Sequence, residues 1–505
     1  MGNPLYDRLF GIHAGKNTPF LHLPDGQTLT HSDFLDMAAR IANALVGMQL
    51  EPGDRVAVQV EKSPETLALY AACAQAGLIF LPLNTAYTTH ELTYFIENSG
   101  ASLVVCDSTN EAELTPIAQA QNAKIETLNA DGSGSLTRRA LGMLPAFEPV
   151  SRTEDDLAAF LYTSGTTGRS KGAMLTQANL LSNAEMLVRE WRFTSDDALL
   201  HALPIFHTHG LFVATNVVLA SGGSMIFLPK FDLEDILRLM PQATSLMGVP
   251  TFYTRLLGGD RFTKELAQHM RLFISGSAPL LAETHEQFEA RTGHRILERY
   301  GMTETNMNTS NPYDGERRAG TVGFPLPDVE LKVTDPETGE TLPQGEIGMI
   351  EVRGPNVFKG YWQMPEKTAA ELRENGFFIT GDLGRVDEDG YVHIVGRGKD
   401  LIISGGYNIY PKEIELLLDD QPGVLESAVI GVPHPDFGET VLGILVPANG
   451  ETPDLEQIMQ TVQSDLARFK HPRKLILLDE LPRNTMGKVQ KNLLRDTYKD
   501  LFTDG

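Results

Sequence analysis

Short apolar runs alternate with longer amphipathic stretches through most of the chain. Residues 55–60 (RVAVQV) alternate as a strand does, and residues 63–65 (SPE) supply a helix N-cap, a first-turn proline and an acid at the positive end of the helix dipole. We therefore expect an Ala- and Leu-rich helix that ends at Gly77, followed by a strand at 78–82.

The same alternation continues with a helix at about 90–98, a strand at 103–106, and further strand and helix patterns at 198–230 and 243–300. Strands that alternate with helices form a largely parallel sheet with helices on both faces. The sequence thus predicts an α/β fold, in which a large multi-layer body takes up roughly the first 395 residues.

The pattern changes after residue 320. Short alternating strands at 328–335, 348–353 and 390–395 are separated by Pro and Gly turns, which predicts a β-rich subdomain. Beyond the charged junction at 396–400 we expect a small α+β unit. Its predicted elements are a helix from Pro411, strands near 426–432 and 441–446, a helix near 454–469 and a final helix from Gln490.

The length of the chain, 505 residues, exceeds a single ordinary core, so two or three folding units are expected. We place the boundary at Lys399, which gives an N-terminal domain of residues 1–398 and a C-terminal domain of residues 399–505. Hydrophobic residues make up 42% of the chain and charged residues 21%, values typical of a globular protein and far from those of a disordered one.

The formal net charge of −24 argues against a nucleic-acid partner, because cation–phosphate contacts dominate nucleic-acid binding. Cys73 and Cys106 lie in apolar surroundings without CxxC spacing, which is typical of buried thiols in a reducing compartment. No run approaches the roughly 18 apolar residues of a membrane span, and no secretory signal is recognised. We therefore expect a cytoplasmic protein with no membrane partner.

The most informative segment is residues 162–172 (YTSGTTGRSKG), which follows an apolar run. Small and hydroxyl side chains let backbone N–H groups approach phosphate oxygens, and Lys171 adds a positive charge, so we expect a nucleotide triphosphate site. A Walker loop is excluded because Ser170 stands where its second glycine belongs. A hydrolase with Ser170 as its nucleophile, in Gly-x-Ser-x-Gly, and a plain Gly-rich surface loop are alternatives. The expected phosphate-binding residues are Thr163, Ser164, Gly165, Thr166, Thr167, Gly168 and Lys171.

Five further segments contain residues suited to chemistry. Residues 204–210 (PIFHTHG) hold two histidines without a nearby third ligand for a metal, and exposed histidines are the alternative there. Residues 275–279 and 298–305 each follow an apolar run and end in small or hydroxyl residues, as loops at the carboxyl edge of a sheet do. Asp382 presents a carboxylate suited to a ribose diol, and Lys488 lies in a turn framed by Pro and Gly.

Together these segments resemble the adenylate-forming superfamily, which comprises acyl-CoA synthetases, luciferases and the adenylation domains of peptide synthetases. Residues 162–172 resemble its phosphate loop, 298–305 its Tyr-Gly-x-Thr-Glu motif and 380–383 its Thr-Gly-Asp motif. Residues 396–406 resemble its hinge and turn, and residues 482–488 its catalytic-lysine motif. The resemblance implies that family's fold, with a large N-terminal domain and a small mobile C-terminal domain.

The resemblance also implies a two-step reaction, in which a carboxylic acid and ATP give an acyl-adenylate and pyrophosphate, and CoA then displaces AMP. The first step brings two anions together, so it needs cations near the α-phosphate. Lys488 is expected to serve there, and Glu304 is expected to bind Mg²⁺, which one or two carboxylates and phosphate oxygens usually hold. His207 and Thr163 complete the expected catalytic set. The other expected ATP-binding residues are Gly276, Ser277, Glu298, Tyr300, Gly301, Met302, Thr303, Asp382 and Arg397.

The same resemblance implies that the C-terminal domain rotates about Lys399 between the two half-reactions. The turn Ser404-Gly405-Gly406 would then line the tunnel for the pantetheine of CoA, where side chains must be small. Lys470 belongs to a local basic cluster in an acidic chain, which suits contact with the CoA phosphates, and a solvated helix end is the alternative.

The sequence around Arg255 suggests the kind of acid. Residues 249–257 (VPTFYTRLL) predict a buried helix opened by a proline, and no acid lies three or four positions from Arg255. We expect its guanidinium to bind a carboxylate of the substrate, with His207, Ser277 and Met302 also at the substrate. The substrate would then be a short dicarboxylate. An arginine paired elsewhere, and an aryl or medium-chain acid as substrate, are the alternatives.

Lys488 also lies in a Pro482-x4-Gly-Lys context that resembles acetylation sites of related synthetases. Acetylation removes the positive charge of a lysine. We therefore expect a lysine acetyltransferase and a deacetylase as partners that act on Lys488.

Overall fold

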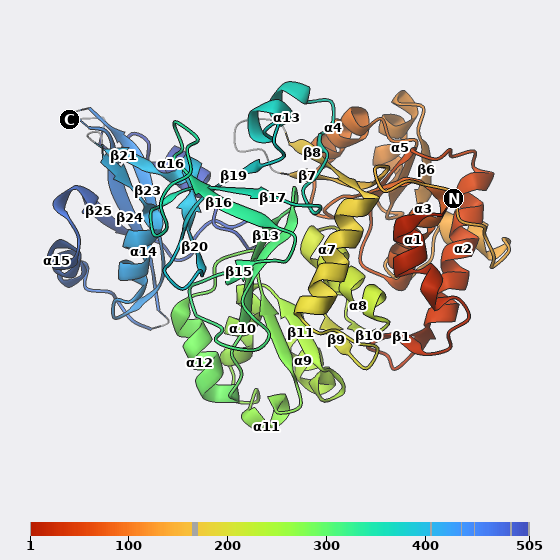
Figure 1. The fold of residues 1–505 in the computed structure, drawn as a ribbon, viewed down its shortest axis with the longest axis horizontal. Helices are drawn as coiled ribbons and strands as arrows, with labels where there is room; N and C mark the ends of the chain where they lie inside the picture. Colours follow the sequence, from red (N-terminus) through yellow and green to blue (C-terminus); the bar gives the residue numbers. More distant parts are fainter. Residues whose placement is uncertain are drawn as a thin grey trace. The chain divides into compact units, whose positions relative to one another are not determined.

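The computed structural model describes residues 2–163, 170–404, 407–435, 437–448, 450–484 and 487–502. The chain groups into two compact units (Figure 1). Unit 1 consists of Met1–Leu331 and Val352–Phe378, and unit 2 consists of Lys332–Glu351 and Ile379–Gly505. Parts of the predicted N-terminal domain thus group with the C-terminal residues, and the predicted hinge at Lys399 stays a prediction.

The first sheet of unit 1 is largely parallel. In spatial order its described strands are β18 (Gly360–Tyr361), β8 (Lys171–Thr176), β7 (Leu157–Thr163), β4 (Ile79–Pro82), β3 (Arg55–Gln59), β5 (Leu103–Cys106) and β6 (Lys124–Thr127). The strands from β7 to β6 pair in parallel, whereas β8 pairs antiparallel with both β7 and β18. The expected parallel sheet is confirmed.

Helix α3 (Pro64–Ala76) shows how local sequence sets the boundaries of these elements. The Ser63 hydroxyl accepts a hydrogen bond from the backbone N–H of Thr66, and Gly77 ends the helix in the left-handed region with φ 71°. Every residue from Thr66 to Ala76 is buried, so the helix has no polar face over that stretch. The predicted helix and the strands on either side of it are confirmed.

The second sheet of unit 1 brings several predicted site segments together. In spatial order its described strands are β15 (Phe324–Pro325), β14 (Asn306–Ser310), β13 (Leu297–Met302), β12 (Leu272–Ser275), β11 (Ser245–Gly248), β9 (Ala198–His201), β10 (Ser224–Phe227), β1 (Pro19–His22) and β2 (Thr28–Thr30). The strands from β13 to β1 pair in parallel. Their carboxyl ends therefore meet at one edge of the sheet.

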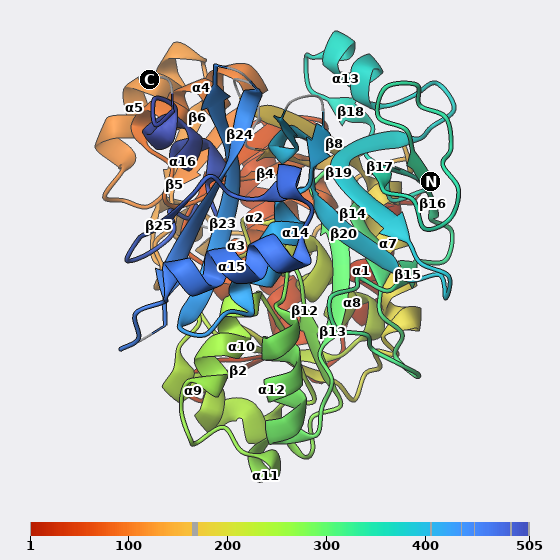
Figure 2. The same ribbon diagram turned by 90° about the vertical axis from the view of Figure 1, so that its left-hand side faces the viewer.

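Most connections between these strands are helical. The other described helices of unit 1 are α1 (Pro4–Leu9), α2 (His31–Gly47), α4 (Thr89–Ser99), α5 (Glu111–Ala120), α6 (Ser135–Leu141), α7 (Gln177–Glu190), α8 (Asn216–Ser221), α9 (Leu233–Leu239), α10 (Pro250–Leu257), α11 (Lys264–Ala267), α12 (Ala282–Thr292) and α13 (Pro365–Glu371). Figure 2 shows α10 and α12 beside β12 and β13.

Unit 2 contains most of a third sheet and all of a fourth. The third sheet has the described order β16 (Glu330–Thr334), β17 (Gly348–Arg353), β19 (Phe378–Val386) and β20 (Val392–Arg397). The fourth has the order β22 (Tyr407–Ile409), β21 (Ile402–Ser404), β24 (Gly438–Pro447) and β23 (Val424–His434), and β25 (Lys474–Leu477) pairs in parallel with β24. Its helices are α14 (Pro411–Asp419), α15 (Leu455–Asp465) and α16 (Lys491–Tyr498).

The fourth sheet has an apolar cluster on each face. Val441 packs in the cluster that includes Leu418 of α14, whereas its neighbour Leu442 packs in the cluster that includes Leu494 of α16. Successive residues of β24 therefore face opposite sides, as the period of a strand requires. The predicted β-rich subdomain and the small α+β unit are confirmed in their main elements.

Two further expectations concern the environment of the chain. Cys73 and Cys106 are both buried free thiols, as expected. Within the part of the chain that the structure describes, we find no helix with the length and apolar composition needed to cross a bilayer.

Candidate active site

Three predicted segments reach the same edge of the second sheet. β12 ends at Ser275, directly before Gly276 and Ser277, and β13 contains Arg299. The histidine loop follows β9, which ends at His201. Because β9, β11, β12 and β13 are parallel neighbours, the loops after them emerge side by side.

Ser277 and His209 form a polar contact at this edge. Ser277 Oγ lies 3.1 Å from His209 Nδ1, and Ser277 adopts a φ of 73°. A positive φ is uncommon for a residue with a side chain and occurs often at functional positions. His209 begins a π-helix (His209–Thr215), and its backbone N–H donates to His207 Nδ1 at 3.4 Å. The predicted residues His207 and Ser277 are thus linked through His209.

Arg299 is a buried cation in the same region. Only 4% of its surface is exposed, and its Nε and Nη2 atoms have no hydrogen-bond partner among the described residues. A Cβ added at Gly276 would lie 2.3 Å from Arg299 Cζ, so the guanidinium rests against Gly276 and a side chain there would displace it. Burial lowers the pKa of Arg299 to about 9. A buried guanidinium with two nitrogens unpaired among the described residues is suited to an anionic ligand.

Other buried polar atoms, in the loop that carries the histidines, also lack partners in the described part of the chain. They include Thr208 Oγ1 and His209 Nε2, and burial, followed by the charge of Arg299, lowers the pKa of His209. Glu298, which precedes Arg299, is 3.6 Å from His285, and burial raises its pKa. Because buried polar atoms are normally hydrogen-bonded, this group of unpaired atoms indicates a binding site.

Arg255 differs from the expectation. It lies on α10 and is exposed, with its Cζ 5.4 Å from the centre of the Phe231 ring. The buried face of α10 instead carries Phe252, Tyr253 and Leu256. The expected burial of Arg255 is therefore wrong, because the helix turns that residue away from its apolar face. Its role as a substrate ligand stays a prediction.

Two residues predicted from separate motifs lie in one polar cluster of unit 1. Lys171 Nζ is 3.1 Å from Glu371 Oε2 and 3.1 Å from the Tyr361 hydroxyl, which is in turn 3.0 Å from Glu304 Oε1. Glu304, the expected Mg²⁺ ligand, is 5% exposed. We call Lys171, Glu304, Tyr361 and Glu371 the Lys171 cluster.

Ser170 lacks the setting that a hydrolase nucleophile needs. A nucleophile elbow is a turn from a strand into a helix. Ser170 instead immediately precedes strand β8, and its carbonyl accepts a hydrogen bond from the Tyr94 hydroxyl at 2.9 Å. The hydrolase alternative therefore has no structural support.

The structure describes only some of the remaining predicted residues in the phosphate loop and the β13 hairpin. Thr163 ends β7, and a Cβ at Gly301 would lie 1.9 Å from the Asn306 carbonyl oxygen, so the hairpin from β13 to β14 requires a glycine. Tyr300 and Met302 are half-buried residues of β13, and Thr303 follows it. The predicted residues outside the described ones are Ser164, Gly165, Thr166, Thr167, Gly168, Gly405 and Gly406.

Unit 2 contains the predicted ribose and hinge residues. Asp382 of β19 lies opposite Arg397 of β20, and Arg397 Nε is 2.9 Å from Asp382 Oδ1. Lys399 lies in the 3-10 turn Gly398–Asp400, where burial lowers its pKa. Ser404 ends β21.

Lys488 lies on a short hairpin of unit 2. Its backbone N–H donates to Asn484 Oδ1 at 3.0 Å, its carbonyl accepts from the Asn484 N–H at 2.9 Å, and Gly487 has a φ of 75°. Lys488 is exposed. The turn therefore presents the lysine outward within its own unit, as the Pro and Gly pattern predicted.

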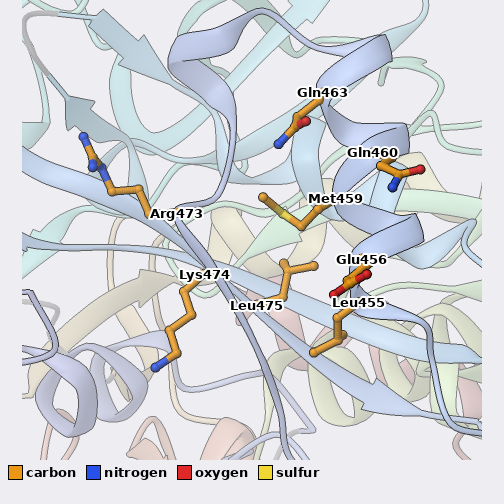
Figure 3. A pocket seen from close by; sticks show the side chains of 8 residues that line it. All are labelled: Leu455, Glu456, Met459, Gln460, Gln463, Arg473, Lys474 and Leu475. Carbon is orange, nitrogen blue, oxygen red and sulfur yellow. The ribbon is translucent and has the colours of Figure 1, made fainter.

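The predicted CoA-binding lysine and its basic neighbours occupy different surroundings. Lys470 Nζ is 2.6 Å from Glu413 Oε1, so its charge is partly neutralised. Arg473 and Lys474 border a groove of about 410 Å³ between α15 and the start of β25, with Met459 and Leu475 at its centre (Figure 3). Contact of this cluster with CoA stays a prediction.

Comparison with known proteins identifies the family. Residues 13–362 match the model of the AMP-binding enzyme, and residues 413–488 match the model of the AMP-binding enzyme C-terminal domain. The chain belongs to the AMP-binding enzyme family. The resemblance stated from the motifs, and the α/β fold class, are confirmed for this AMP-binding enzyme.

Solved and curated relatives span most of the chain. The AMP-binding enzyme is similar to the crystal structure of ATP-bound MatB from Rhodopseudomonas palustris, with 60% identity, coverage of 99% of this chain and 100% of that chain, and a TM-score of 0.98. It is 36% identical to a malonate–CoA ligase of Arabidopsis thaliana over 89% of this chain and 78% of the relative. It is 37% identical to a feruloyl-CoA synthase of an Amycolatopsis species over 94% of each chain.

Sequence reasoning missed Arg299, Tyr361 and Glu371. Arg299 stands in the segment quoted for the Tyr-Gly-x-Thr-Glu motif, and the signal that could have found it is the pair of charged residues, Glu298 and Arg299, that follows the apolar residues Ile296 and Leu297. Tyr361 and Glu371 belong to none of the motifs quoted. The pairing of β18 with β8 brings Tyr361 to Lys171, and α13, which follows β18, carries Glu371.

Proposed function

We propose that this AMP-binding enzyme is a malonate–CoA ligase, a malonyl-CoA synthetase that converts malonate, ATP and CoA into malonyl-CoA, AMP and pyrophosphate. The observation that carries the proposal is Arg299, a buried guanidinium with Nε and Nη2 unpaired among the described residues, next to Ser277 and His209. A dicarboxylate that is activated at one end keeps an anion at the other, which a fork of N–H donors binds well. The malonate–CoA ligase of Arabidopsis thaliana, at 36% identity, supports this substrate.

Arg299 is the proposed ligand of the distal carboxylate. Ser277 and His207 are proposed to complete the clamp, because both lie on the hydrogen-bonded path through His209. Arg255 stays the alternative ligand. Methylmalonate should be accepted in part, since one extra methyl group in a pocket changes discrimination by only about 1–3 kcal/mol.

The described residues fit ATP with Mg²⁺. No group of three or more His, Cys, Asp or Glu among them is arranged to hold a metal, so an ion at Glu304 would take its other ligands from phosphates and water, as Mg²⁺ usually does. When bound, Mg²⁺ supplies positive charge to the triphosphate. Lys171 is proposed to contact the β- and γ-phosphates, and Asp382 the ribose, where its carboxylate is already oriented by Arg397.

The two half-reactions use different groups in this proposal. Lys488 brings a positive charge to the malonate carboxylate and the α-phosphate while the new C–O–P bond forms and pyrophosphate leaves. The CoA thiol then attacks the acyl carbonyl, the C–O bond to AMP breaks, and the thiol proton is released. Lys399 as the hinge, and Ser404, Gly405, Gly406 and Lys470 as residues of the CoA path, are part of the same proposal.

A synthetase for an aryl or medium-chain acid is the second candidate. The feruloyl-CoA synthase, at nearly the same identity as the malonate–CoA ligase relative, favours it. Such an acid has an apolar tail, which an unpaired buried cation such as Arg299 would oppose. Pyrophosphate release measured with malonate, methylmalonate, butyrate and ferulate therefore distinguishes the two candidates. Malonate as the poorest of the four substrates would contradict the proposal.

Substitution of Arg299 tests the residue that carries this assignment. Arg299→Leu should reduce kcat/KM for malonate by about 10²–10³-fold, because loss of a charge-assisted contact at a desolvated site costs roughly 2–5 kcal/mol. Activity with butyrate should stay unchanged or rise. Gly276→Ala should act in the same direction, since its Cβ would displace the guanidinium.

Arg255→Ala is the matched control for the Arg299 variant. Because Arg255 is exposed, its loss should change kcat/KM for malonate by less than about threefold. The opposite result would be a selective loss of activity with malonate in Arg255→Ala and an equal loss with malonate and butyrate in Arg299→Leu. In that case Arg255 is the ligand and Arg299 is structural.

We propose that acetylation of Lys488 regulates the first half-reaction. Its exposed side chain is suited to an acetyltransferase and a deacetylase, and acetylation would remove the charge needed at the α-phosphate. Acetylated protein should lose pyrophosphate release and regain it on deacetylation. Full activity in protein that mass spectrometry shows to be stoichiometrically acetylated at Lys488 would exclude this. We also propose a cytoplasmic location, because both cysteines are free thiols.

A further inference from the structure

Glu371 is a carboxylate that no motif explains, and cations hold it from two sides. Lys171 Nζ lies 3.1 Å from its Oε2 and 3.3 Å from its Oε1, and Lys367 Nζ lies 2.7 Å from its Oε1. Glu371 ends α13, where the helix dipole disfavours an anion, so these ion pairs offset an unfavourable position. The Lys171 and Glu371 side chains are 15% and 22% exposed, so water screens their pairing only in part.

Tyr361 connects this ion pair to Glu304. The Tyr361 hydroxyl lies 2.6 Å from Glu371 Oε2 and 3.0 Å from Glu304 Oε1, yet it has one proton and can donate to one carboxylate at a time. Burial, and then the charge of Glu304, raises the pKa of Tyr361, so the phenol stays neutral. Lys171 Nζ also lies 4.2 Å from the centre of the Tyr361 ring.

In the Lys171 cluster the positive charge of Lys171 is therefore already balanced by the carboxylate of Glu371. Burial raises the pKa of Glu371, but hydrogen bonds from Lys367 and Tyr361 and the charge of Lys171 hold it below its usual range overall, so the carboxylate is ionised. A triphosphate that binds Lys171 would add anionic oxygens beside this carboxylate. Phosphate and carboxylate would then compete for one ammonium group.

We propose that Glu371 is a positioning residue for the nucleotide step. It forms an ion pair with Lys171 in the protein without nucleotide. When ATP binds, it competes with the β- and γ-phosphates for the ammonium group, and the ion pair forms again when pyrophosphate leaves. This rests on the proposed function, in which Lys171 contacts those phosphates. Glu371 thereby weakens ATP and pyrophosphate binding without affecting AMP, which has neither phosphate.

Binding of nucleotides to the Glu371→Gln variant tests the proposal. The glutamine keeps the size of the side chain and an acceptor oxygen but removes the charge. ATP, measured by calorimetry with Mg²⁺ and without acid or CoA, should bind about threefold to tenfold more tightly than to the native protein, and pyrophosphate should bind more tightly too. The affinity for AMP should not change, which a general loss of structure would not produce.

Two further variants make the test specific. Glu366→Gln removes a charge from the first turn of the same helix and should leave ATP affinity unchanged. In a Lys171→Met background, Glu371→Gln should no longer tighten ATP binding, because the ammonium group for which Glu371 and the phosphates compete is absent. Unchanged or weaker ATP binding by Glu371→Gln would overturn this inference alone. Native protein that fails to bind ATP would instead contradict the proposed function.

Discussion

Lys62 shows how a buried polar residue holds the loop that carries the histidines. Its Nζ lies 2.8 Å from His201 Nδ1, 2.9 Å from the His201 carbonyl oxygen and 3.0 Å from the Leu203 carbonyl oxygen. His201 Nε2 in turn lies 2.9 Å from the Gly210 carbonyl oxygen. Buried hydrogen bonds thus connect both ends of the loop that contains His207, and each would be costly to leave unmade.

His31 is one residue through which stability should depend on pH. It is 1% exposed and stacks on His13 and Phe20, with ring centres 4.3 Å and 4.7 Å apart. Burial, and then the charge of His13, lowers its pKa to about 4, whereas an unfolded histidine has a pKa of about 6.5. Between these values the unfolded chain binds a proton that the folded protein does not. The contribution of neutral His31 to stability is therefore fully present above about pH 6.5 and is lost as the pH falls toward 4.

We expect His31→Phe to be less sensitive to acid than the native protein. At pH 5 the free energy of unfolding of the native protein should be about 2 kcal/mol lower through His31, because its folded and unfolded pKa values differ. Phenylalanine keeps the stacked ring but has no titrating group. The measurement is the apparent unfolding midpoint at pH 7.5 and pH 5. His90→Phe, at an exposed histidine, is the control. An equal acid shift in all three proteins would contradict the role of His31.

At the scale of elements, boundaries set by local chemistry could be predicted. The cap at Ser63 and the glycine at Gly77 fixed α3, and prolines marked the starts of α10 and α14. Alternation of strands and helices was enough for the parallel sheets, because a parallel pair needs a long crossover connection. Three of the predicted site segments also met at one edge of the second sheet, where β9, β12 and β13 run parallel.

Facts that depend on pairing across the sequence could not be predicted. Arg299 packs against Gly276 because β13 pairs with β12, and no local pattern states that pairing. Tyr361 reaches Lys171 because β18 pairs with β8 although 190 positions separate the two residues. The face of α10 that carries Arg255 was misjudged because apolar neighbours show that a helix is buried but not which side of it packs.

At the scale of the whole molecule, the proposed site residues are divided between the two units. Arg299, Glu304 and Lys171 belong to unit 1, whereas Asp382 and Lys488 belong to unit 2. In the proposed reaction, the second half-reaction still needs the residues that hold the malonyl group. It has no new anion to bring to the α-phosphate, so it does not need Lys488. The proposed function therefore predicts that loss of Lys488 slows the first half-reaction and leaves the second nearly unchanged.

Lys488→Ala should reduce pyrophosphate release from malonate and ATP by at least about 10²-fold, because the two anions then converge without a preorganised positive charge. Thioester formation from supplied malonyl-adenylate and CoA should stay within a few-fold of the native rate. Lys499→Ala, at an exposed lysine of the same unit, is the control for a change in charge and should affect neither step. The two half-reactions are measured separately, by pyrophosphate release and by chromatography of malonyl-CoA. An equal loss in both would mean that Lys488 supports the fold or both reactions, and the proposed division of labour would be wrong.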